Sequence, residues 1–186
     1  MVEDVELEAR AALERNDFEA TLNALMEGYG DAVFRLCLML LRQQDLAEDV
    51  RQLTFVQAFE ALPRFRRQST FRTWLLSIAR NRCLDAAKHR KRQQRWVVDS
   101  DPPEPVQKST LPGQRVERIG IRKALGYCLA KLSDADREAV VLRVSVELSY
   151  PEISGMLAVD PDAVRMRVLR ALEKLRRCLS AKGVTP

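Results

Sequence analysis

The stretch SYPEISGMLAVDPDAVRMRVLRALEKLR, residues 149–176, carries the clearest helix signals in this 186-residue chain. Ser149 with Glu152 three residues later is a capping-box pattern, which marks the start of a helix. Asp160 before Pro161 marks a second start, because aspartate caps helices and proline is favoured in their first turn. The stretch therefore predicts a short helix, a tight turn and a long helix, an arrangement typical of a helix-turn-helix.

These two helices are predicted over residues 150–157 and 161–180, and the second has one apolar face. The residues at spacings of four and three that should pack inward are Val164, Val168, Leu172 and Leu175. The residues expected outward in the half that can enter a major groove are Arg165, Met166, Leu169 and Arg170, with Arg167 flanking them. Arginines there can hydrogen-bond base edges or phosphates. From the spacing alone, a solvated face on a structural helix remains an alternative.

Other helix signals occur on both sides of residue 100. Ser133 with Asp136 predicts a further helix start in the C-terminal half. In the N-terminal half, Asp17 begins an apolar helical pattern that we expect Gly28 and Gly30 to interrupt. A second apolar helix should follow them.

Two longer helices are predicted before residue 95. Asp45, with Glu48 at the third helical position, should cap a helix that runs to about Ala61. A long helix is expected from about Phe71 to Gln93. Because β-branched residues do not alternate along the chain, no strand is predicted and the fold class is all-α.

A proline-rich stretch divides the chain. Residues 97–114 are polar, lack helical periodicity and contain Pro102, Pro103, Pro105 and Pro112. Such a segment is typical of an extended, semi-stiff linker. We therefore predict two small helical domains, at 1–95 and 116–186, joined by a linker at 96–115.

Charge is distributed unevenly. The formal net charge is +5, but residues 64–95 carry 11 Lys and Arg against one Asp, a net +10. Residues 1–63 carry 5 basic and 13 acidic side chains, a net −8. A concentrated basic block is expected to face a polyanion such as nucleic acid, with a membrane surface as the alternative.

Several functional classes are excluded by what the sequence lacks. The four cysteines lie far apart, without a CxxC pair, and His89 is the only histidine, so no metal site is expected. We expect each cysteine to be a small buried apolar residue. No catalytic motif is present, so we predict no enzyme activity and no cofactor. The acidic N-terminus and the absence of a long apolar run predict a cytoplasmic protein without membrane contact of its own.

The segment FRRQSTFRTW, residues 65–74, interleaves aromatic and polar side chains. Phe65, Phe71 and Trp74 alternate with arginines, an amide and hydroxyls. Aromatic rings beside cations and amides suit unstacked bases better than an intact duplex. An aromatic core beneath a charged surface is the alternative.

The helix predicted from Asp45 has a mixed acidic and aromatic face. Acids and amides alternate there with Phe55 and Phe59, which we expect to be exposed. Such a stripe resembles an interface anchor, although a solvated face over a bundle core fits as well.

Taken together, these segments resemble a known family. DLAEDVRQLTFVQAFEALPRF (45–65), followed by STFRTWLLSIARNRCLD (69–85), is similar to region 2 of bacterial extracytoplasmic-function (ECF) sigma factors. REAVVLRVSVELSYPEISGMLAVDPDAVRMRVLRALEKLR (137–176) is similar to region 4. The resemblance runs in the right order from about Asp17 to Leu179. It implies an initiation subunit that binds core RNA polymerase and directs it to promoter DNA.

The resemblance also implies residue roles. Contact with the clamp helices of the largest polymerase subunit is implied for Asp45, Glu48, Asp49, Gln52 and Phe55. Capture of the single-stranded −10 element is implied for Phe65, Arg66, Arg67, Gln68, Ser69, Thr70, Trp74, Arg80 and Asn81. Phosphate contacts are implied for Lys88, Arg90, Lys91, Arg92 and Arg95. Recognition of the −35 element in the major groove is implied for Asp162, Arg165, Met166, Arg167, Leu169 and Arg170. A cognate anti-sigma factor is a further implied partner.

Two other functions are weighed against this one. A stand-alone helix-turn-helix regulator would bind a palindromic duplex without polymerase. A protein that binds RNA or a membrane surface through the basic block alone would leave the C-terminal helix-turn-helix unexplained.

Overall fold

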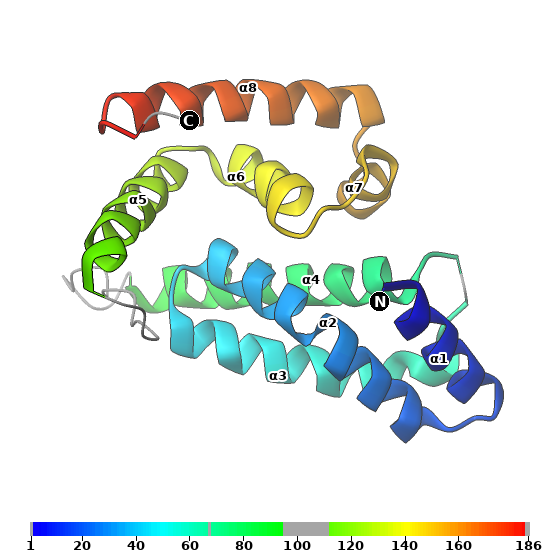
Figure 1. Ribbon diagram of the computed structural model, residues 1–186. Coiled ribbons are helices and arrows are strands. Elements are labelled where there is room, and N and C mark those ends of the chain that lie inside the picture. Colours follow the sequence, from blue (N-terminus) through cyan, green and yellow to red (C-terminus); the bar gives the residue numbers. More distant parts are fainter. Residues whose placement is uncertain (1, 67, 95–111, 185–186) are drawn as a thin grey trace. The chain divides into compact units, whose positions relative to one another are not determined.

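The computed structural model describes residues 2–66, 68–94 and 112–184 (Figure 1). All regular elements in these ranges are helices, so the all-α prediction is confirmed. The chain divides into two compact units, Met1–Pro105 and Val106–Pro186. Within the described ranges, no helix is long and apolar enough to cross a membrane.

The first unit is a bundle built around its second helix. Its elements are α1 (Val2–Glu14), α2 (Phe18–Leu41), α3 (Gln44–Ala61), the short 3₁₀-helix η1 (Leu62–Arg64) and α4 (Phe71–Gln94). Helix α2 packs against α1, α3 and α4. The largest fully buried side chains of this core are Leu25, Tyr29, Leu36, Leu62, Phe71, Leu75 and Leu76.

The predicted break at Gly28 and Gly30 is wrong, because α2 continues through both residues. A Cβ atom at Gly28 would lie 2.5 Å from both Cγ atoms of Val5. Glycine at this position therefore lets α1 approach α2 closely. Helix α1 itself was not predicted.

The predicted cap at Asp45 is also wrong. The N-cap residue is Gln43, two residues before Asp45, and it makes no side-chain capping bond, so helix α3 begins at Gln44. Asp45 lies instead in the first turn, where a negative charge interacts favourably with the helix dipole.

The second unit contains the predicted helix-turn-helix. Its elements are α5 (Pro112–Ala130), α6 (Asp134–Val140), the single π-turn η2 (Val141–Ser145), α7 (Tyr150–Leu157) and α8 (Pro161–Ser180). Helix α8 packs against α5, α6 and α7. Helix α5 starts at Pro112, inside the stretch that the sequence assigned to the linker.

The three capping predictions for the second unit are confirmed. Ser133 accepts a hydrogen bond from the Asp136 backbone N–H, and Ser149 and Glu152 form a complete capping box. The Asp160 carboxylate accepts hydrogen bonds from the N–H groups of the second and third residues of α8. Between α7 and α8, Ala158 adopts the left-handed conformation (φ 52°) that ends α7.

The inward face of α8 differs from the prediction at one position. Val164, Val168 and Leu175 are buried as expected, but Leu172 is 38% exposed. Ala171 is fully buried in its place. The 3.6-residue period of a helix brings position 171 into the line of 164, 168 and 175.

The cysteines behave differently in the two units. Cys37 and Cys83 are buried and belong to no disulfide, as predicted. Cys128 and Cys178 are instead joined by a disulfide that links α5 to the last turn of α8. Their treatment as two separate apolar residues is therefore wrong.

Candidate functional site

An apolar groove of about 380 Å³ lies between α2 and α3. Its lining residues are Leu22 and Met26 from α2, and Arg51, Gln52, Phe55, Val56, Phe59 and Glu60 from α3. Met26, Val56 and Phe59 are 46%, 56% and 44% exposed, an unusual exposure for large apolar side chains. We call this feature the α2/α3 groove.

The position of Phe55 differs from the prediction. It is 6% exposed and contributes a wall of the groove, whereas Phe59 is the exposed aromatic residue. The reason is that α3 packs against both α2 and α4, and position 55 lies in this buried interior whereas positions 56 and 59 do not.

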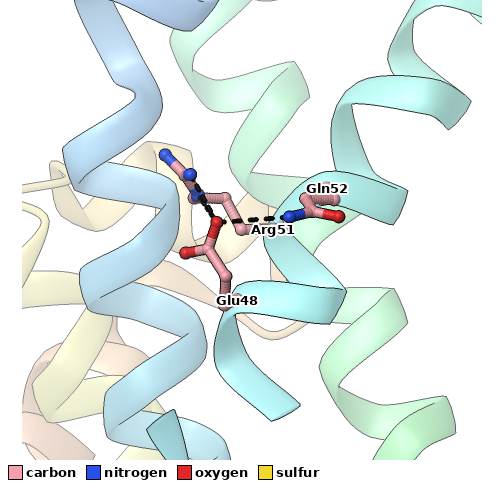
Figure 2. Close-up of polar contacts among 3 residues, drawn as sticks. All are labelled: Glu48, Arg51 and Gln52. Atoms are coloured by element: carbon pink, nitrogen blue, oxygen red, sulfur yellow. Dashed lines mark hydrogen bonds and ion pairs between the residues drawn. The ribbon is translucent and has the colours of Figure 1, made fainter. Parts of the chain in front are cut away.

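Polar side chains border the groove at the start of α3. Figure 2 shows the Glu48 carboxylate accepting hydrogen bonds from Arg51 Nη2 (2.5 Å) and Nε (3.2 Å). Gln52 Nε2 lies 3.5 Å from the same carboxylate oxygen. Asp45 and Asp49 are exposed. The groove is thus an apolar surface with a polar edge, the usual composition of a protein-binding site.

The loop between η1 and α4, residues 65–70, rests on an aromatic cluster. The Phe65 ring stacks on that of Phe71, with centroids 4.4 Å apart, and lies 5.0 Å from the ring of Trp74. Phe71 is fully buried, while Phe65 and Trp74 are partly buried. The three rings therefore form a base beneath the loop, and two of them keep exposed area.

The polar residues of this 65–70 loop face solvent. Arg66, Gln68, Ser69 and Thr70 are exposed, and Arg67 lies outside the described residues. The Thr70 hydroxyl oxygen accepts a hydrogen bond from the Thr73 N–H at 3.1 Å and so caps α4. The loop can therefore offer charge, an amide and hydroxyls above an aromatic base.

Farther along α4, basic side chains continue from the loop. Arg80 is partly exposed and lies 3.4 Å from the side-chain oxygen of exposed Asn81. Arg82 instead donates to Gln57 at 2.6 Å, which ties α4 to α3. Because its guanidinium is bound within the bundle, we assign Arg82 a structural role.

The predicted phosphate-binding residues occupy the second half of α4. Lys88 and Arg92 are exposed and Arg90 is partly exposed. Lys91 belongs to the helix but its side chain is not described, and Arg95 lies outside the described residues. Earlier in the same helix, Ala79 and Cys83 are buried, whereas Leu84 is 36% exposed.

In the second unit, the outer face of α8 combines charged and apolar side chains. Asp162, Arg165, Met166, Leu169 and Arg170 are exposed, and Arg167 is partly exposed. Met166 and Leu169 are 49% and 48% exposed. Apolar groups on such a face can contact thymine methyl groups, while arginines bond guanine edges or phosphates.

Local contacts hold α8 and the turn before α7 in place. Lys174 Nζ lies 2.8 Å from the Asp136 carboxylate and, with Arg167 nearby, holds the pKa of that carboxyl below its ordinary value. The Arg143 guanidinium donates to the Leu148 carbonyl at 3.0 Å and lies over the Tyr150 ring. The first contact joins α6 to α8, and the Arg143 contacts join η2 to the start of α7.

The structure thus groups the predicted residues into three surfaces. Of the 45–55 set, Gln52 and Phe55 line the α2/α3 groove, Glu48 contacts Gln52, and Asp45 and Asp49 are exposed on the same helix. The 65–81 set follows the loop into α4, and the 162–170 set lies on α8 in the other unit. Met26 and Val56 belong to the groove but were not among the predicted site residues, whereas Phe59 is exposed as the sequence predicted. The signal for Val56 was present, since apolar residues follow both faces of α3.

Comparisons with known proteins match the two units to two families. Residues 25–95 match the family described as Sigma-70 region 2, and residues 122–175 match Sigma-70, region 4. The RNA polymerase sigma factor CarQ of Myxococcus xanthus is 32% identical to this chain, over 75% of the chain and 78% of that protein. The ECF RNA polymerase sigma factor SigW of Bacillus subtilis is 28% identical, over 83% and 87%. The solved structure of CnrH in complex with the cytosolic domain of CnrY has a TM-score of 0.68 and 26% identity, over 95% and 97%.

Proposed function

The chain belongs to the extracytoplasmic-function family of RNA polymerase sigma factors, and we propose that its described surfaces divide the recognition of polymerase and promoter. Members of this family are transcription initiation factors rather than enzymes. The chain therefore binds core RNA polymerase and directs it to promoters through −10 and −35 elements. The residue assignments that follow are our proposal.

The α2/α3 groove and the polar start of α3 bind the clamp helices of the largest polymerase subunit. Exposed Met26, Val56 and Phe59 lose contact with water when a partner helix covers them, and this burial supplies affinity. Asp45, Glu48, Asp49 and Gln52 form the polar edge that orients the partner. Phe55 supports the groove from beneath.

The 65–70 loop and α4 hold the opened −10 strand. The exposed amide and hydroxyls of Gln68, Ser69 and Thr70 offer hydrogen bonds to an unstacked base, over the partly exposed rings of Phe65 and Trp74. Arg80, Asn81 and the basic second half of α4 follow the strand backbone. Arg67 and Arg95, which lie outside the described residues, belong to the same proposal.

The outer face of α8 reads the −35 duplex. The observation that carries this assignment is the position of Arg165, Met166 and Arg170, which are exposed along the first half of a helix whose inner face is buried. The first turn of α8 is fixed by the Asp160 cap, so these side chains are held at a defined angle. Asp162, Arg167 and Leu169 complete this surface.

We further propose the domain limits 1–95 and 116–186, a cytoplasmic location and a cognate anti-sigma factor. CnrH, which is similar to this chain, is bound to the cytosolic domain of CnrY in its solved structure. An inhibitor of this kind would cover the α2/α3 groove or the α8 face and so compete with polymerase or promoter. A search by affinity purification from the native organism would identify it.

A titration of purified core RNA polymerase with labelled protein tests the polymerase assignment. We expect saturable binding that Phe59→Asp weakens at least tenfold, because a carboxylate would be buried without a partner. Equal affinity of the variant and the natural protein would remove the groove from the polymerase interface.

A further inference from the structure

The Glu6 side chain links helix α1 to the start of α4. The Glu6 carboxylate accepts a hydrogen bond from the Phe71 backbone N–H at 3.1 Å and one from the Arg72 N–H at 3.0 Å. The Tyr29 hydroxyl of α2 donates to the same carboxylate at 2.9 Å. One residue thus joins three helices at the edge of the 65–70 loop.

These bonds complete the start of α4. The first four N–H groups of a helix have no partner within it. In α4, Glu6 accepts from the N–H groups of residues 71 and 72, and the Thr70 hydroxyl oxygen accepts from residue 73. The N–H of residue 74 then makes the first helical bond, to the Thr70 carbonyl. A carboxylate at the Glu6 position also interacts favourably with the helix dipole. Two of these three capping bonds therefore come from α1.

Helix α1 packs tightly against α2, which holds Glu6 in place at the start of α4. Val5 packs into the space left by the absent side chain of Gly28, one residue before Tyr29. Tyr29 is 2% exposed, and burial followed by its hydrogen bond to Glu6 raises the pKa of its hydroxyl. The hydroxyl therefore remains a proton donor at any physiological pH, and the Glu6 carboxylate is held from both sides.

Phe71 connects this contact to the loop. Its N–H is bound by Glu6, while its buried ring stacks on Phe65 at the other end of the 65–70 loop. Both ends of the loop are thus fixed at one residue, and the exposed Gln68 and Ser69 lie between them. The orientation of the loop depends on where Phe71 is held.

We propose that Glu6 is a positioning residue for −10 recognition, and that α1, which precedes the matched residues 25–95, is part of the promoter-opening site. This inference rests on the proposed role of the 65–70 loop. Without Glu6, the first turn of α4 loses two caps, and a smaller fraction of the molecules holds the 65–70 loop in the arrangement that captures a base. The apparent affinity for that base falls in proportion to this fraction.

A second effect distinguishes positioning from general support of the fold. Removing the carboxylate leaves two N–H groups at a helix start free to bind a phosphate oxygen. Binding that depends only on charge should therefore persist while base discrimination declines. A purely structural role would lower core binding, −35 binding and −10 binding together.

The variants are chosen to remove one contact at a time. Glu6→Ala removes both caps, Tyr29→Phe removes the third donor, and Gly28→Ala places a methyl group against Val5 and displaces α1. The matched control is Glu8→Gln, which neutralises an exposed carboxylate on the same helix. Each full-length variant is combined with core RNA polymerase.

The measurement is the affinity of the holoenzyme for fork-junction DNA with a single-stranded −10 segment. Two single-stranded segments are compared: the one that the natural protein selects from a random library, and a scrambled version of it. Base discrimination is the ratio of the affinity for the selected segment to the affinity for the scrambled one. We expect Glu6→Ala and Gly28→Ala to lower this ratio about fivefold, the usual effect of a lost helix cap. Tyr29→Phe should lower it less, and Glu8→Gln should leave it unchanged.

Two outcomes overturn the inference. They are an unchanged ratio in Glu6→Ala, and an equal loss of core, −35 and −10 binding in that variant. Gln68→Ala and Ser69→Ala separate this failure from that of the proposed function. If these loop variants lower the ratio and Glu6→Ala does not, the inference alone fails. If the loop variants leave the ratio unchanged, the loop assignment fails and the inference fails with it.

Discussion

The disulfide between Cys128 and Cys178 closes a loop of 50 residues that contains nearly all of the helix-turn-helix unit. A cross-link of this span stabilises a fold by about 2–4 kcal/mol, mainly because it restricts the unfolded chain. We predict that Cys178→Ser lowers the free energy of unfolding of the second unit by about this amount. Thermal unfolding followed by circular dichroism, with and without a thiol reductant, measures the effect. Reductant should have no further effect on the variant, and a transition insensitive to reductant in the natural protein would contradict the prediction.

Arg165→Ala and Arg170→Ala should weaken binding of the holoenzyme to duplex −35 DNA. The expected loss is about 1–3 kcal/mol where the guanidinium contacts a base, with relaxed preference at that base pair. A phosphate contact would instead lower the salt dependence of binding by about one unit of slope. Arg176→Ala, which removes the same charge from the exposed second half of α8, is the control. Equal losses in all three variants would place recognition elsewhere.

Val56→Asp should reduce affinity for core polymerase at least tenfold, because it places a charge in the α2/α3 groove. Val144→Asp is a close match, since Val56 and Val144 are 56% and 54% exposed and lie in different units. Promoter-independent binding to core polymerase is measured for both. A greater loss for Val144→Asp than for Val56→Asp would refute the groove assignment.

The acid stability of the second unit should depend on Asp136. Because Lys174 lowers the pKa of this carboxyl in the folded state, the ionised form stabilises the fold above about pH 4. This contribution is lost as the pH falls through the lower folded pKa. Lys174→Met should remove it, and the cost near pH 7 should stay below about 1 kcal/mol because Lys174 is largely exposed. Urea unfolding gives the free energy of unfolding of the natural protein and of Lys174→Met at several pH values between 2 and 7. A difference between the two proteins that does not change with pH would contradict the prediction.

Local signals predicted much of the second unit. Ser149 with Glu152, and Asp160 with Pro161, gave the starts of α7 and α8 because caps and proline act within one turn. The inner face of α8 was also predictable, apart from the exchange of Leu172 for Ala171. That error arose because the large Leu172 continues the spacing of Val164 and Val168, while the small Ala171, which lies on the buried line, is a weaker apolar signal.

The errors in the first unit have a different origin. Gly28 was taken as a helix break because its partner Val5, 23 positions away in the chain, cannot be inferred from local pattern. The contact between Glu6 and Phe71, 65 residues apart, is equally invisible without the fold. The same reason applies in the second unit to the Cys128–Cys178 pair, whose separation of 50 residues gives no local spacing signature.

The candidate site was predictable where exposure follows from polarity. The arginines of α8 and the polar residues of the 65–70 loop are exposed as their chemistry requires. The α2/α3 groove was only partly anticipated. Exposure of Phe59 was predicted, but exposure of Met26 and Val56 contradicts their apolar character and could not be inferred from local pattern.

The central claim is that this chain confers promoter-specific initiation on core RNA polymerase. Run-off transcription with purified bacterial core polymerase on a library of genomic DNA from the native organism, with and without the protein, tests it most directly. We predict that transcripts starting at a common pair of −10 and −35 sequences appear only when the protein is added. They should disappear when Val56→Asp replaces the natural protein. Identical transcripts with and without the protein, combined with tight binding of a palindromic duplex by the protein alone, would contradict the account.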